Sequence, residues 1–324
     1  MGILKKLTEE YFGEIEREED FINIDGLDVE IVSFTDNNDK FHKKGYKPKD
    51  KDTLKKLLKR MIKVRGDGGD FNDIDTSDIT SMELLFNDNK TFNGDITGWN
   101  ISSVRNMRSM FYGAESFNQP IGDWEFPNVR YMSGMFYFAK SFNQPIGNWE
   151  FPNVEKMSCM FCNATSFNQD ISKWKFPKVE NMSCMFWDAS SFNQPIGDWE
   201  FPNVKDMSNM FYYATSFNQD ISKWEFPNVT DMSGMFMEST SFNQPIGNWK
   251  FPNVENMNCM FYDATSFNQD LSKWEFPNVK YMDYMFSGAT SFDQDLSKWD
   301  LSKKEKLGIF DGCPIKKEYK PKMK

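Results

Sequence analysis

The chain contains few of the residues that enzymes most often use for catalysis. Its 324 residues include a single histidine, His42, and five cysteines. One histidine in a polar stretch is a poor basis for a histidine-activated serine or cysteine nucleophile. The sequence has no glycine-rich phosphate loop, zinc-protease motif or calcium-binding loop. We therefore expect no enzymatic activity, no catalytic residues and no cofactor.

Long apolar runs are also absent. No stretch approaches the roughly 18 apolar residues of a membrane-spanning helix. The first residues, MGILKKLTEEYFGEIEREED, show neither an apolar core nor a small-residue cleavage site of a secretory signal. We therefore expect no transmembrane segment and a cytoplasmic location, in which the cysteines would stay reduced.

Charge is unevenly distributed along the chain. The net charge is −10, yet residues 40–65 and the tail after Leu301 are rich in lysine, whereas the repeats between them are acidic. An acidic surface repels phosphate groups, so we expect no nucleic acid on the repeats.

The dominant feature of the sequence is a tryptophan that recurs every 25 residues. A fixed period of 20 to 50 residues is typical of solenoids, in which each coil buries its apolar side against its neighbours. A Met-Phe pair recurs with the same period, and the degenerate pairs Leu85-Phe86 and Ile309-Phe310 bring the number of coils to about ten. The tryptophans are Trp99, Trp124, Trp149, Trp174, Trp199, Trp224, Trp249, Trp274 and Trp299.

Residues 121–142 illustrate one coil. Trp124 and Phe126 would point to the same side of a short strand, which Pro127 would end. Val129, Met132, Met135 and Phe136 follow with the spacing of one helix face. Parallel strands stack about 4.8 Å apart and helices about 8–10 Å apart, so the helices would splay and the strands would line a concave face.

The charged residues beside each tryptophan vary from coil to coil, and they are the candidate binding surface. They would point outward from the concave strand face, where a partner could contact them. The alternative is a solubilising face with cross-strand charge pairs. The candidates are Asp123, Glu125, Glu150, Lys173, Lys175, Asp198, Glu200, Lys223, Glu225, Lys250, Lys273 and Glu275.

Two further columns stand out. A column of asparagines is expected to form a structural ladder, because a buried amide at each turn can bond backbone groups of its own and the next coil. The column after each Met-Phe pair holds large side chains, which would be either an exposed interaction stripe or half-buried between helices. The asparagines are Asn118, Asn143, Asn168, Asn193, Asn218, Asn243 and Asn268.

The cysteines provide one candidate for metal or redox chemistry. Cys159 and Cys162 form a Cys-x-x-Cys motif, and Cys184 lies one repeat after Cys159. No fourth ligand is evident, and the column of Cys159 otherwise holds mostly small residues. We therefore expect packing cysteines and no metal site.

The repeat resembles a known family. The columns W-x-F-x-x-V-x-x-M-x-x-M-F-x-x-A-x-x-F-N-Q-x-I are similar to the BspA-type leucine-rich repeat family, catalogued as domain of unknown function 285, over residues 71–313. The resemblance implies a right-handed, leucine-rich-repeat-like α/β solenoid and a binding role, often at the surface of bacterial cells. It implies no catalytic residues.

Four segments are expected. Residues 1–45 would form a small α+β appendage, with a helix from Ile3 to Glu16 and a hairpin around Asp25-Gly26. Residues 46–70 would be a linker and a basic amphipathic helix over 52–64 that caps the solenoid, or contacts a membrane surface or nucleic acid. The repeats cover 71–313, and 314–324 are a basic tail.

These features predict a non-enzymatic, monomeric protein–protein interaction scaffold that binds a partner through its concave strand face. The alternative is a structural, assembly or surface-adhesion protein of the same repeat family, located at the cell surface.

Overall fold

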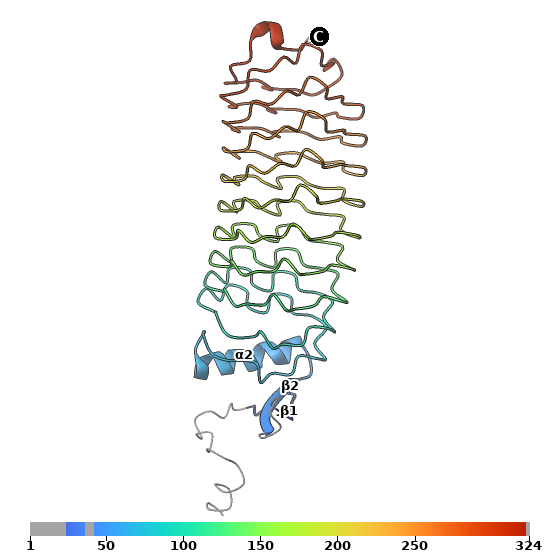
Figure 1. Cartoon of the computed structure of the whole chain (residues 1–324). Helices are drawn as coiled ribbons and strands as arrows, with labels where there is room; N and C mark the ends of the chain where they lie inside the picture. The colour runs from blue at the N-terminus through green and yellow to red at the C-terminus, as the bar shows by residue number, and fades with distance from the viewer. Residues whose placement is uncertain (1–23, 36–41, 322–324) are drawn as a thin grey trace, which may run out of the picture.

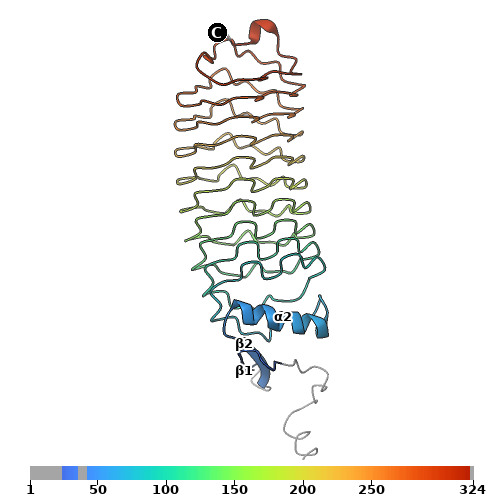
Figure 2. The ribbon, with the colours of Figure 1, turned by 180° about the vertical axis from the view of Figure 1, so that it is seen from behind.

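The computed structural model describes residues 24–35 and 42–321. Figure 1 shows a column of stacked coils, with the N-terminal helix and strands at one end and the C-terminus at the other. The view from behind in Figure 2 shows the same continuous stack. One apolar core runs through it, from Leu54 beneath the first coil to Ile315 beyond the last.

Two N-terminal strands form an antiparallel pair. Strand β1 (Val29–Thr35) is antiparallel to β2 (His42–Pro48). A turn is present at Asp25-Gly26, where the Leu27 N–H donates to the Ile24 carbonyl at 2.9 Å. Strand β1 begins after that turn, and most of the strand expected before the turn lies outside the described residues, so the hairpin stays a prediction. The helix expected from Ile3 to Glu16 lies outside the described residues.

Helix α2 (Lys51–Arg65) spans the residues for which the sequence predicted a helix. The Asp50 side chain accepts the Thr53 N–H at 2.8 Å and so caps its first turn, and Gly66 ends it with a φ of 77°. Leu54, Leu57, Leu58 and Met61 are buried in the core that the first coil shares. The short 3-10 helix η2 (Lys317–Tyr319) lies at the opposite end.

Successive coils are joined through the Met-Phe segment. Eight parallel bridges in this part of the described stack link residues 25 positions apart, starting at Ser81↔Asn106, and the last bridge, Tyr281↔Glu305, spans 24 positions. In the segment that follows each bridging residue, every second backbone N–H donates to a carbonyl of the next coil, and most of the others donate to a carbonyl three residues back. The N–H groups of Met107, Ser109, Phe111 and Gly113 reach the carbonyls of Tyr131, Ser133, Met135 and Tyr137 at 2.8–2.9 Å.

The short helix expected in each coil is therefore wrong. Residues 129–132 are extended or bridging and 133–138 form consecutive turns, and no helix is present in the described coils between α2 and η2. Gly134 and Phe138 have left-handed backbones, with φ of 65° and 58°, which a continuous α-helix does not allow. Turns closed by bonds three residues back keep Met132 and Met135 buried at a spacing that a helix would also produce.

The expected strand at Trp-x-Phe is also wrong. The Trp124 N–H donates to the Ile121 carbonyl of its own coil at 3.2 Å, and Pro127 has no N–H to donate. The alternation of side chains still holds, since Trp124 and Phe126 are buried while Glu125 is exposed. With neither strands nor helices in the described coils, the argument for a concave strand face no longer applies. Assignment to right-handed, leucine-rich-repeat-like solenoids stays a prediction.

Aromatic side chains stack along the whole column. Every repeat tryptophan is at most 4% exposed, and Trp174 and Trp199 stack with centroids 6.4 Å apart and planes inclined by 4°. The indole N–H of Trp174 donates to the Ile146 carbonyl of the previous coil at 3.0 Å. The other repeat tryptophans except Trp124, whose indole N–H has no partner among the described residues, make the equivalent bond. Most coils therefore contribute ring surface and a buried hydrogen bond to a neighbour, so coils are stable only as a stack.

Candidate functional site

The residues immediately before and after each repeat tryptophan form one charged surface, which we call the Trp face. All twelve sequence-predicted candidates, from Asp123 to Glu275, are exposed. Their exposure follows from packing. The indole and the phenylalanine two residues later point into the core, so the residue before the tryptophan and the residue after it point toward solvent.

The sign of the charge changes along the Trp face. Asp123, Glu125 and Glu150 are acidic, the next coil presents Lys173 and Lys175, and acidic residues return at Asp198 and Glu200. Some neighbouring coils therefore carry unlike charges, as at Glu150 and Lys175, whereas others carry like charges, as at Glu125 and Glu150.

Few of these charges are paired within the chain. Lys223 Nζ lies 2.9 Å from Asp198 Oδ1, and both side chains are about three-quarters exposed, so this pair contributes little to stability. Among the described residues no other ion pair involves the twelve candidates. Their charges thus remain available to a partner.

Shallow hollows open between coils on this face. One of about 420 Å³ lies between Trp224 and Lys250 and is bordered by Lys223 and Glu225. A smaller one of about 220 Å³ lies beside Gln169 and Lys173. No backbone ladder closes the described face here, which leaves room between successive Trp-x-Phe segments.

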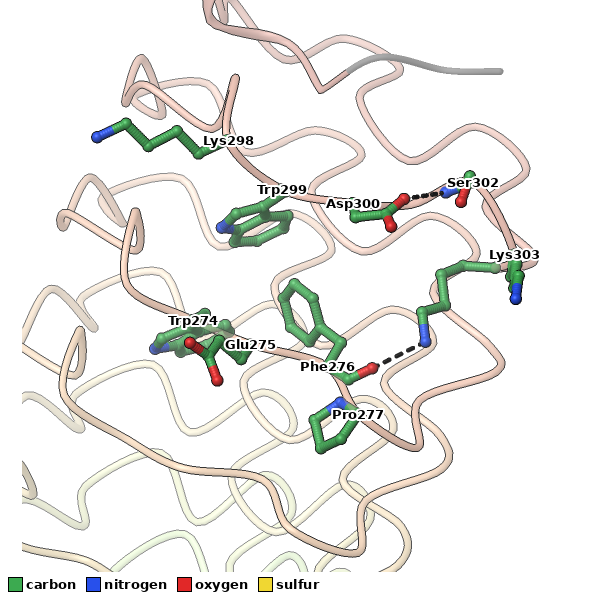
Figure 3. Close-up of a pocket in the computed structure, with 10 residues that line it drawn as sticks. Trp274, Glu275, Phe276, Pro277, Lys298, Trp299, Asp300, Ser302 and Lys303 are labelled. Carbon is green, nitrogen blue, oxygen red and sulfur yellow. Dashed lines mark hydrogen bonds between the residues drawn. The ribbon is translucent and has the colours of Figure 1, made fainter.

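The hollow at the last coil, of about 400 Å³, has a different composition (Figure 3). Here the repeated W-x-F-P-N-V becomes Trp299-Asp-Leu-Ser-Lys-Lys304, so a lysine replaces the buried valine. Lys304 Nζ donates to the Phe276 carbonyl at 2.8 Å, and burial lowers the pKa of its ammonium. Phe276 is only partly buried, whereas its counterparts in earlier coils are buried. Sequence reasoning missed Ser302, Lys303 and Lys304, although their departure from the repeat was the available signal.

The asparagine column carries a continuous row of hydrogen bonds. Asn193 Oδ1 accepts the backbone N–H of Asn218 at 2.9 Å and also the side-chain amide of Gln219 at 2.9 Å. The same bond to the next coil recurs at Asn118, Asn143, Asn168, Asn218, Asn243 and Asn268. These amides bind backbone groups, so they contribute to stacking and not to ligand recognition.

The cysteines lie apart from the Trp face. Cys159 and Cys184 hydrogen-bond to each other, which lowers the pKa of the Cys159 thiol and raises that of Cys184. Cys162 is buried, and burial raises the pKa of its thiol to about 12. A raised pKa, as at Cys162 and Cys184, disfavours the thiolate that would bind a metal. Within the described part of the chain, no group of three His, Cys, Asp or Glu side chains is arranged to hold a metal ion.

Among the helices that the structure describes, none has both the length and the apolar composition needed to cross a membrane.

Comparison with known proteins identifies one family. Three overlapping segments, residues 53–161, 144–236 and 216–318, each match the model of the family described as "Mycoplasma protein of unknown function, DUF285". No curated protein matches the chain, and neither does any solved structure.

Proposed function

We propose that this chain, which belongs to the DUF285 family, is a non-enzymatic scaffold that binds a protein partner through its Trp face. The observation that supports this proposal most directly is the row of exposed, mostly unpaired charges whose sign changes several times along the stack. The hollows beside these charges offer places for partner side chains.

Charge order would provide the specificity. A partner lying along the stack would need basic groups opposite Glu125 and Glu150, acidic groups opposite Lys173 and Lys175, and basic groups again opposite Glu200. A partner with another charge order would place like charges together, which disfavours the complex. Rim charges of this kind mostly affect the association rate and its salt dependence.

The ends of the stack favour a monomer over end-to-end assembly. Helix α2 covers the core at the first coil. At the last coil the Leu296 N–H donates to the Tyr319 carbonyl at 2.9 Å, and Lys320 lies over the Phe310 ring at 5.6 Å. Covered ends leave little apolar surface for another stack.

The same proposal includes membership of the BspA-type leucine-rich repeats and a cytoplasmic location. The similarity of the repeat columns to that family's repeat supports the membership. A cell-surface adhesion role is the alternative, and protease treatment of intact cells would distinguish the two locations, because only surface-exposed protein is cleaved.

Charge reversal on the Trp face is the test of the binding proposal. We expect a variant with Glu125, Glu150, Glu200 and Glu225 changed to Lys to lose a partner captured by affinity purification. A matched control reverses four exposed acids outside this face, Glu30, Asp52, Asp311 and Glu318, with the same change in net charge. Equal retention of the partner by both variants would refute the assignment of the Trp face.

A further inference from the structure

Each coil contains a residue, two positions after its Met-Phe pair, that has a left-handed backbone. Seven of these ten positions hold Gly, Asn or Asp, which adopt this conformation at little cost. The exceptions are Phe138, Tyr213 and Glu238, with φ of 58°, 60° and 55°. A bulky side chain in this region is an outlier, and such strain tends to persist where it serves a function.

The two strained rings lie in aromatic clusters. Phe138 stacks on Tyr137 with centroids 4.6 Å apart and meets the edge of Tyr112 at 6.1 Å. Tyr213 meets the edge of Tyr212 at 6.1 Å, and Tyr212 stacks on Trp187 at 5.2 Å. The column following the Met-Phe pairs thus supplies the inner ring of each cluster.

The hydrophobic core does not account for these rings. Tyr213 is 45% exposed, and neither Phe138 nor Tyr213 is part of the buried core. A Gly, Asn or Asp at the same position serves the turn equally well in the other coils. Tyr213 is therefore an exposed ring and Phe138 a half-buried one, and both cost backbone energy outside the core.

Carboxylates lie beside the second cluster. Asp188, Tyr213 and Glu238 follow one another in consecutive coils of this column. No ion pair with either carboxylate is present in the part of the chain that the structure describes. Burial raises the pKa of the Asp188 carboxyl, and a nearby cation would offset that cost. Aromatic rings beside carboxylates without a cationic partner favour a cationic ligand.

We infer that Phe138, Tyr213 and Glu238, with the rings around them, form a second interaction surface that binds an extended, arginine-containing segment of a basic protein. We call this surface the aromatic edge. It lies roughly half a coil along the chain from the Trp face, so it does not depend on the function proposed for that face. Arginine suits it because a guanidinium can stack on a ring while it pairs with a carboxylate.

The spacing of the clusters specifies the segment. Phe138 and Tyr213 are three coils apart, and parallel backbones stack about 4.8 Å apart, so the clusters are roughly 14 Å apart along the ladder. An extended chain rises about 3.3 Å per residue, which puts residues i and i+4 roughly 13 Å apart. The preferred segment therefore carries arginines separated by three residues.

A synthetic peptide tests this inference. The probe is the fluorescently labelled heptapeptide Thr-Arg-Thr-Val-Thr-Arg-Thr, whose β-branched residues favour an extended chain. Its control has the same composition with the two arginines adjacent. By fluorescence anisotropy with the full chain, we expect the spaced peptide to bind more tightly than the control.

The decisive variant is Phe138→Asn with Tyr213→Asn, which copies the Asn163 of the same column and leaves the net charge unchanged. We expect it to weaken peptide binding about tenfold, as the loss of two cation–π contacts implies, while its melting temperature stays equal or rises. Asn163→Gly, between the clusters, is the control and should leave binding unchanged.

Four results would overturn the inference. Equal binding of the two peptides would refute the spacing, and undiminished binding by the double variant would show plain charge attraction. A lower melting temperature of that variant would make the rings packing residues. Self-association in light scattering that the double variant abolishes would instead identify a second copy of this chain as the occupant.

Discussion

Removal of one asparagine from the ladder is the sharpest test of how the coils are held together. Asn193 lies near the middle of the stack, where its Oδ1 accepts the Asn218 N–H and the Gln219 amide, each at 2.9 Å. Asn193→Ala deletes this acceptor without touching the aromatic stacks. The backbone N–H of Asn218 then loses the partner it has in this half-buried site.

The expected loss follows from these two bonds. An unsatisfied, largely buried N–H costs about 1–3 kcal/mol, and the lost side-chain bond adds about 0.5–1.5 kcal/mol. Since the site is half-buried and water can reach part of it, we expect Asn193→Ala to lower the free energy of unfolding by about 2 kcal/mol. Asn193→Asp keeps an acceptor oxygen, as Asp293 does in the last coil of the column. It should therefore cost less than half as much.

Urea unfolding followed by tryptophan fluorescence measures both variants, because the stacked indoles are exposed together when coils separate. Amide hydrogen exchange adds a local measure: protection of Asn218 should fall in Asn193→Ala and persist in Asn193→Asp. If the alanine variant is as stable as the wild type, or the aspartate variant loses as much as the alanine variant, the ladder does not stabilise the stack as argued.

Two further predictions concern the ends of the stack. Burial lowers the pKa of Lys304 in the folded chain. Just below pH 10.5 the unfolded chain therefore binds more protons than the folded chain, and the free energy of unfolding of the wild type rises with pH in that range. Lys304→Val should be more stable than the wild type at pH 7 and exceed it by less at pH 10. The same difference in urea midpoint between the two proteins at both pH values would contradict this. Asp73, only 7% exposed, accepts both Arg65 Nη groups at 2.7 Å. Asp73→Ala should cost about 2–3 kcal/mol by leaving a half-buried guanidinium unpaired; unchanged hydrogen exchange in α2 would count against it.

The 25-residue period predicted which side chains are buried and which are exposed, because burial depends on which residues are apolar. Trp124 and Phe126 are buried and Glu125 is exposed, in agreement with their alternation. Helix α2 was predictable because its apolar spacing continues from Leu54 to Ile62 and its first turn has an aspartate cap.

Backbone conformation within the coils could not be predicted in the same way. Spacings of three and four, as at Val129, Met132 and Phe136, are compatible with a helix and with consecutive turns closed three residues back. The distinguishing signal lay in two other columns, where Gly113 and Gly134 mark left-handed positions. Only some coils have glycine at these two positions, which looks like ordinary variation between repeats. The left-handed backbone at these positions was therefore not predicted.

The sequence by itself determined that 25-residue units stack, and which side chains they bury, because burial depends on residue type and spacing. Only the tertiary structure decided which backbone segment carries the hydrogen bonds between coils. An isolated coil can satisfy half of the N–H groups around its Met-Phe pair within its own turns; the other half find acceptors only when a second coil lies against it.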